Sequence, residues 1–279
     1  MISRLRRRSA NVRARSRLAA PLLAAPLLAA VTLAGCTQGG LDLGDSPGAL
    51  VSEQEVTRMS LQTWERIKQE EPPSQDRAMQ RRVDQIARRI TRAAGVADGQ
   101  PWEVVVFQGD QVNAFALPGR RIGVYEGLVK LADSDGEIAG VIAHEVGHVL
   151  AEHSQERLGA AKLSQIGAQA LNAALQAGNV GYANQIAGLL GAGAKYGVIL
   201  PYGRTQELEA DRFGLMTMAK AGYDPRAAID FWTKMARQSQ GKAPPEFAST
   251  HPSNERRLNQ LRELLPEAMQ VYRRNEGGT

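Results

Sequence analysis

One short motif constrains this chain more than any other feature of its sequence. Residues 144–148 read His-Glu-Val-Gly-His, within a run of apolar residues at helical spacing that follows Ser134, a residue type that favours helix N-termini. At 100° per residue, His144 and His148 lie on one helical face, where both imidazoles can reach one cation. Glu145 projects beside them, where a carboxylate can act as a base. The motif therefore predicts a metal site with an adjacent base.

The third metal ligand has to come from farther along the chain. A metzincin motif would continue with Gly at position 151 and His at position 154, but the sequence has Ala151 and Ser154. The only cysteine is Cys36, which leaves no thiolate ligand for the folded part. No acidic residue lies at positions 157–206, which excludes a carboxylate ligand about twenty residues beyond the motif.

The next acidic residues are Glu207, Glu209 and Asp211. Glu207 and Asp211 are four apart on a predicted helix and share one face, whereas Glu209 is turned about 200° away and is expected to be solvated. Glu207 is therefore the predicted third ligand. Asp211 is expected to accept the free N–H of a ligating imidazole, by analogy that of His144. Gly214 would let this helix approach the motif helix closely.

Apolar periodicity predicts a predominantly helical chain of the α+β class. The predicted helices span residues 53–69, 75–94, 126–132, 204–221, 225–238 and 253–272, with a longer one beginning at 134. Ser134 and Glu137 are expected to form a capping box at the start of that longer helix. Strand-forming residues are confined to 102–107, 112–116 and 122–125, which predicts one small antiparallel sheet.

Residues 159–203 have an unusual composition, because they are rich in Ala, Gly, Leu and Gln and contain no acidic residue. A helical hairpin is one interpretation of this composition. A mobile lid over a cleft and a surface that dips into lipid are the others.

The net charge of +5 arises from the start of the chain. Residues 1–35 hold seven Arg and no acidic residue, so the remaining 27 basic and 29 acidic residues give a net charge of −2. Because phosphate binding needs a cationic face on the folded domain, this distribution removes the electrostatic argument for a nucleic-acid partner.

The Arg-rich start precedes an apolar run at 18–34 and then Cys36, in the order Leu-Ala-Gly-Cys. This pattern predicts a lipoprotein signal peptide at 1–35 and a lipidated Cys36. A transmembrane anchor is the alternative, which two prolines and a short apolar run disfavour. Residues 36–51 then form a flexible, lipidated tether, and 52–279 form the catalytic domain.

The motif and its distant carboxylates resemble family forty-eight of the metallopeptidases, which includes HtpX-, Oma-, BepA- and LoiP-like enzymes. That family shows HExxH followed by ExxxD, matched here by His144, Glu145, His148, Glu207 and Asp211. The resemblance covers about residues 52–265 and is closest to the small periplasmic lipoprotein branch. It implies a gluzincin-like zincin scaffold that holds one Zn²⁺ per chain.

The resemblance also bears on residues outside the motif. It places His251 near zinc, where it takes the open coordination position or stabilises the oxyanion as a catalytic residue; a helix-capping loop histidine is the alternative. The strand Asn113, Ala114, Phe115 and Ala116 resembles the edge along which zincins bind substrate, or is an ordinary edge strand. Arg257 either braces the site through a carboxylate or is exposed. His153, about 140° round a continuous helix from His148, is left off the metal.

These observations predict a zinc endopeptidase that hydrolyses peptide bonds through a metal-activated water. The resemblance implies protein quality control in the cell envelope, with unfolded or misassembled envelope proteins as substrates. The protein is expected to face the periplasm on its lipid. Thr37 after the lipidated cysteine favours the outer membrane. The alternative is a zinc-stabilised, non-proteolytic assembly factor or chaperone of the envelope.

Overall fold

The computed structural model describes residues 47–97, 99–162, 165–166, 203–238, 245–251 and 255–276, all within the compact unit Leu43–Thr279. The expected signal peptide, Cys36 and most of the tether lie outside the described residues, as does most of the segment 159–203. Among the described residues, none of the helices combines the length and the apolar character that crossing a membrane requires.

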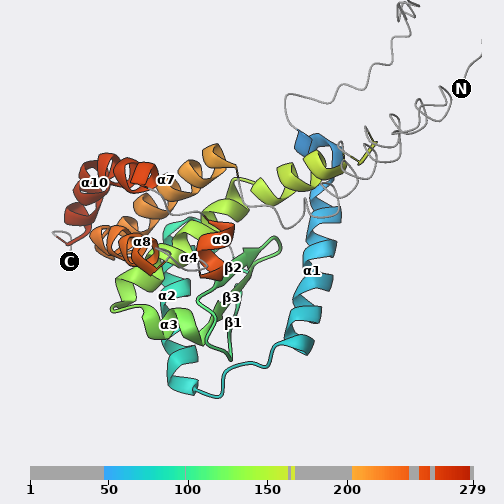
Figure 1. Cartoon of the computed structure of the whole chain (residues 1–279), viewed down its shortest axis with the longest axis horizontal. Coiled ribbons are helices and arrows are strands. Elements are labelled where there is room, and N and C mark those ends of the chain that lie inside the picture. The colour runs from blue at the N-terminus through green and yellow to red at the C-terminus, as the bar shows by residue number, and fades with distance from the viewer. Residues whose placement is uncertain are drawn as a thin grey trace, which may run out of the picture. The chain divides into compact units, whose positions relative to one another are not determined.

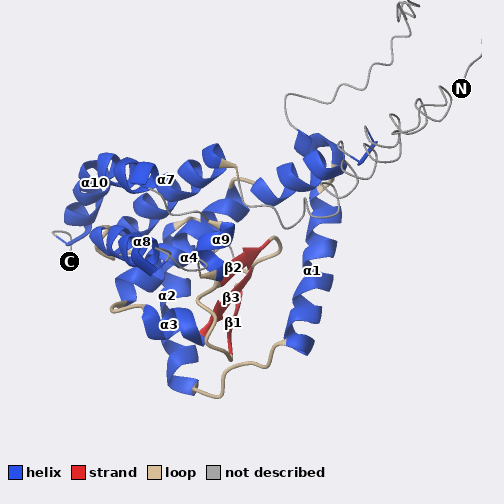
Figure 2. Ribbon diagram, viewed as in Figure 1, coloured by secondary structure: helices blue, strands red, loops and turns tan. Residues whose placement is uncertain are grey.

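Helices dominate the described chain and surround one small sheet, which confirms the predicted fold class (Figure 2). The helices are η1 Pro47–Leu50, α1 Glu53–Glu70, α2 Arg77–Ala93, α3 Glu126–Leu131, α4 Asp135–Leu150, α7 Arg204–Lys220, α8 Arg226–Gln238, α9 Glu246–Thr250 and α10 Glu255–Glu276. The short α9 was not expected from the sequence. Residues 153–162 are also helical.

The sheet has three strands, β1 Glu103–Phe107, β2 Ala114–Leu117 and β3 Arg121–Tyr125, in the order β1-β3-β2. β2 and β3 pair antiparallel across a turn at Gly119, as expected. β1 instead pairs parallel with β3, so the sheet is mixed rather than wholly antiparallel. The cause is the connection after β1, which places β2 on the far side of β3 and leaves β2 at the edge.

Helices cover both faces of the sheet (Figure 1). Successive side chains of each strand point to opposite faces, so each strand contributes to two separate packing layers. One face joins the main core with α2 and α4, through Val106, Ala114, Ala116, Ile122 and Val124. The other face packs Phe107, Phe115 and Tyr125 around Trp64 of α1. The helix α1 therefore lies across the sheet from α2 and α4.

The start of α4 is held firmly. The Ser134 hydroxyl accepts the Glu137 N–H at 3.2 Å, as the predicted capping box requires. The Glu137 carboxylate, however, accepts the Asp133 N–H at 2.9 Å and pairs with Lys234 at 2.8 Å, so the reciprocal half of the box is replaced by an ion pair with α8. This ion pair fixes the helix that carries the motif.

Candidate metal centre

The motif helix α4 and the helix α7 lie in close contact, which brings their polar residues together. Gly214 of α7 lies against the His144 backbone, where an added Cβ would come within 3.1 Å of the amide nitrogen. Gly147 lies in the same way against Ala210, at 3.3 Å. The expectation that small residues permit a close approach of these helices is confirmed.

Four side chains from three parts of the fold converge at this contact. His144 and His148 come from α4, Glu207 from the first turn of α7, and His251 from the end of α9. Their candidate ligand atoms all lie within 4.8 Å of one another, and all four residues are buried. The structure thus places the predicted third carboxylate at the motif.

The four side chains suit a divalent metal ion of the zinc type. The Nε2 atoms of His144 and His148 are 3.1 Å apart, and His148 Nε2 lies 3.4 Å from Glu207 Oε1. Ligand atoms bound tetrahedrally at about 2.0–2.1 Å would lie about 3.4 Å apart, close to these separations. The donor set is nitrogen and oxygen, without sulfur, which zinc accepts.

Burial adjusts the charges of the ligands in the metal-free chain. It lowers the pKa of His148 to about 4 and, together with the nearby Arg257, lowers that of His144 well below its usual value. Both imidazoles are therefore neutral, as metal ligation requires. Burial alone would raise the pKa of Glu207, but hydrogen bonds to His148 and His251 lower it, so this carboxylate is ionised.

Asp211 and Arg257 support the cluster from behind. Asp211 Oδ1 lies 3.0 Å from His144 Nδ1, the contact expected from the helix spacing. Arg257 of α10 donates to both Asp211 oxygens at 2.7 and 2.6 Å, and its Nη1 lies 2.8 Å from Glu207 Oε2. Its guanidinium also lies 3.5 Å from the centre of the Trp232 ring. Arg257 is buried and joins both carboxylates of α7.

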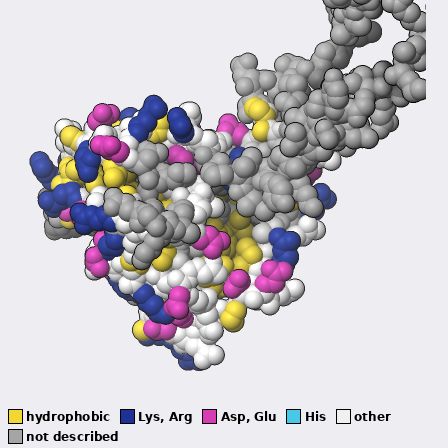
Figure 3. Space-filling model, in the orientation of Figure 1, with side chains coloured by type: hydrophobic (Ala, Val, Ile, Leu, Met, Phe, Trp, Pro, Cys, Tyr) yellow, Lys and Arg dark blue, Asp and Glu magenta, His cyan; other side chains and the backbone are white. Residues whose placement is uncertain are grey.

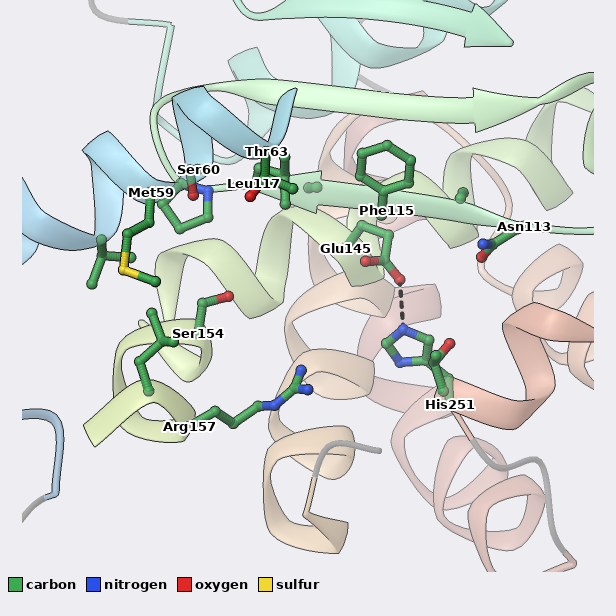
Figure 4. A pocket seen from close by; sticks show the side chains of 16 residues that line it. Met59, Ser60, Thr63, Asn113, Phe115, Leu117, Glu145, Ser154, Arg157 and His251 are labelled. Atoms are coloured by element: carbon green, nitrogen blue, oxygen red, sulfur yellow. Dashed lines mark ion pairs between the residues drawn. The ribbon is translucent and has the colours of Figure 1, made fainter. Parts of the chain in front are cut away.

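Glu145 lies beside the cluster, facing His251. His251 Nε2 is 3.3 Å from Glu145 Oε1, while His251 Nδ1 is 2.9 Å from Glu207 Oε1 (Figure 4). Burial raises the pKa of Glu145 to about 7, and the His251 charge opposes this shift. A carboxyl group with a pKa near neutrality can take up and release a proton in the same reaction cycle.

His153 lies outside the candidate ligand group and Glu209 is exposed, as the sequence predicted, but the contact between these two residues was not expected. His153 Nδ1 lies 2.9 Å from His148 Nδ1, and His153 Nε2 lies 3.3 Å from Glu209 Oε2. The expectation for His153 assumed a continuous helix, but α4 ends at Leu150 and Glu152 adopts a left-handed φ of 55°. Glu209 is exposed, as expected for a solvated charge, and it also contacts His153. His153 thus contacts a candidate ligand without being one itself.

A cavity of about 350 Å³ opens beside Glu145 and His251. Its walls are α1, the edge strand β2 and residues 153–162, and Figure 4 shows Met59, Phe115 and Leu117 among the side chains that line it. The surface of this region is largely apolar, at the centre of the view in Figure 3. Asn113, Ala114 and Ala116 also line the cavity, so the predicted substrate strand lies at the site.

Comparison with known families agrees with this geometry. The model of the family described as "Peptidase family M48" matches residues 74–265, which is more than half of the chain. The chain belongs to peptidase family M48. The M48 family consists of zinc-dependent metallopeptidases, so the fold is that of a zincin-like metallopeptidase, as the sequence resemblance implied.

Similar M48 proteins come from both eukaryotes and bacteria. The "Mitochondrial metalloendopeptidase OMA1" of Schizosaccharomyces pombe is 36% identical over 188 residues, covering 67% of this chain and 53% of that protein. The "Beta-barrel assembly-enhancing protease" of Yersinia pestis is 30% identical over 232 residues, covering 79% of this chain and 46% of that protein. The "Beta-barrel assembly-enhancing protease" of Escherichia coli K12 is 27% identical over 244 residues, covering 83% of this chain and 49% of that protein. This chain spans about half the length of these relatives.

Proposed function

We propose that this chain is a zinc-dependent endopeptidase of the cell envelope. The observation that carries the proposal is the convergence of His144, His148 and Glu207, with Glu145 placed between these residues and an open cavity. A purely structural metal site has no need of a buried base that faces a cavity.

His144, His148 and Glu207 are the side chains that would hold Zn²⁺. The ion supplies Lewis-acid chemistry, which polarises a carbonyl and lowers the pKa of water toward neutrality. Asp211 Oδ1 lies 3.0 Å from His144 Nδ1, where it is the proposed acceptor of the Nδ1–H, which leaves Nε2 as the ligand atom. Arg257 balances the two carboxylates, which would otherwise repel each other across one helical turn.

Glu145 is the general base and then the general acid. It takes a proton from the attacking water and returns it to the amine nitrogen that leaves when the peptide bond breaks. His251 is the proposed second catalytic residue, because it lines the cavity beside Glu145, where an imidazole N–H can stabilise the developing oxyanion.

The edge strand β2 is the proposed substrate-binding element. The β3 side of β2 is already paired, and its residues line the cavity on the other side. An extended peptide can add to such an edge through main-chain hydrogen bonds, which depend little on side-chain identity. Asn113, Ala114, Phe115 and Ala116 then align the substrate, while the apolar wall of α1 accepts a side chain.

Met59→Glu should weaken substrate binding through this wall. Met59 lines the cavity, so a charge there should raise KM for casein about tenfold and leave zinc content unchanged. Leu61→Glu is the matched control, because Leu61 is a similarly exposed apolar residue of α1, 42% against 38%, and is not a lining residue. Equal KM values for the two variants would show that Met59 takes no part in substrate binding.

The N-terminal pattern suggests how the chain is divided and where it is located. Residues 1–35 act as the signal peptide, 36–51 as a tether lipidated at Cys36, and 52–279 as the catalytic domain. The lipid holds the protein on the outer membrane, where the catalytic domain faces the periplasm. Unfolded or misassembled envelope proteins are the proposed substrates. The bacterial relatives named for β-barrel assembly support this location, although the OMA1 relatives are mitochondrial. The lipid is the proposed contact with the membrane, and nucleic acid is no partner.

One preparation tests the proposal. The full chain, produced in a bacterial host, should fractionate with membranes, carry one zinc per molecule and cleave casein until 1,10-phenanthroline removes the metal. Cys36→Ser should release the same activity into the soluble fraction. Zinc-loaded protein that cleaves neither casein nor another unfolded protein would instead support a non-proteolytic assembly factor.

A further inference from the structure

A second chain of contacts leads away from the candidate ligands through His148. His148 Nδ1 lies 2.9 Å from His153 Nδ1, and the other nitrogen of His153 lies 3.3 Å from Glu209 Oε2. His153 is 1% exposed, whereas the side chain of Glu209 is 63% exposed. A buried imidazole thus joins a candidate ligand to a surface carboxylate.

The chemistry of imidazole fixes where the protons lie in this chain. His148 Nε2 points to His144 and Glu207, so it must be unprotonated to bind a metal. A neutral imidazole then carries its proton on Nδ1, which must find an acceptor. The facing nitrogen of His153 is that acceptor, so the proton of His153 lies on Nε2 and is donated to Glu209.

We propose that His153 and Glu209 form a positioning relay, which holds the ring and the tautomer of His148 and thereby strengthens zinc binding. The proposal rests on the zinc site proposed above. In this relay, His153 accepts the Nδ1–H of His148 and so holds its ring. Asp211 has the same role for His144, through a direct contact at 3.0 Å. Neither His153 nor Glu209 belongs to the ligand group itself.

Glu209 is the useful position for a test, because its exposure makes it dispensable for the core. Exposed ion pairs contribute little to stability, so Glu209→Ala should fold like the wild type. Glu267→Ala is the matched control, since Glu267 is 53% exposed and pairs with Arg212 of the same helix α7 at 3.3 Å. That pair makes no contact with a candidate ligand in the part of the chain described.

The measurement is zinc affinity of the full chain, by competition with a chromophoric chelator. Glu209→Ala should lower the affinity about tenfold, the lower end of the effect of removing an outer partner of a ligand. Glu267→Ala should leave it unchanged. Glu209→Gln, which keeps an acceptor oxygen without the charge, should restore most of the loss. In Co²⁺-loaded protein, Glu209→Ala should also shift the visible absorption bands, because the orientation of His148 changes.

The outcomes separate the relay from the site on which it rests. Wild-type affinity and an unchanged cobalt spectrum in Glu209→Ala would overturn the relay while leaving the zinc site intact. An equal loss in Glu209→Ala and Glu209→Gln would assign the effect to charge alone and would also overturn it. Failure of the wild-type chain to bind zinc would overturn the proposed function, and the relay with it.

Discussion

Glu207→Gln is expected to lower the zinc affinity of the full chain by more than about 100-fold, beyond the loss expected from an outer partner. The amide has nearly the shape of the carboxylate but is a poor zinc ligand. Arg257 keeps both hydrogen bonds to Asp211, so the contact between α7 and α10 should survive. Chelator competition measures the affinity, and circular dichroism checks the fold.

Glu267→Ala again serves as the control, because it removes an exposed carboxylate next to α7 without touching the cluster. Its zinc affinity should equal that of the wild type. Undiminished zinc binding by Glu207→Gln would show that a residue other than Glu207 is the third ligand.

Glu145→Gln is expected to separate zinc binding from catalysis. The variant should retain one zinc per chain, because Glu145 is not among the candidate ligands, and should cleave casein about 10²- to 10⁴-fold more slowly. Cleavage by this variant at the wild-type rate would show that Glu145 is not the general base. Loss of zinc together with activity would show that Glu145 is structural.

The same variant should reveal the pKa of Glu145 through stability. The folded-state pKa of about 7 lies above the ordinary value of 4.5, so the folded chain binds the proton more tightly than the unfolded chain. This stabilisation is fully present below pH 4.5 and is lost as the pH rises through 7. Relative to Glu145→Gln, metal-free wild type should lose about 3 kcal/mol of unfolding free energy between pH 4 and 8.

Local patterns predicted the parts of the site that depend on helix geometry. His144 and His148 share a face of α4, and the spacing of Glu207 and Asp211 placed both carboxylates toward that face. Small residues at the contact of α4 and α7 predicted the close approach. Each of these inferences needs only a regular helix, and the helices are regular where they were used.

The features that the sequence did not predict depend on how the chain reverses and packs. The contact of His153 with His148 is not predictable from the sequence, because nothing in the neighbouring residues predicts that Glu152 adopts a left-handed conformation, which is uncommon outside glycine. The parallel pairing of β1 with β3 is likewise a non-local choice, made by the path of the intervening chain. The wall that α1 contributes to the cavity follows from packing around Trp64, which periodicity within α1 does not specify.

The central claim is that two imidazoles and one distant carboxylate bind a single zinc ion. Anomalous diffraction at the zinc edge, from crystals of the full chain with one equivalent of zinc, tests it most directly. We expect one peak about 2.0–2.2 Å from His144 Nε2, His148 Nε2 and a Glu207 oxygen. A peak bound by other residues, with these three side chains free of metal, would contradict the account.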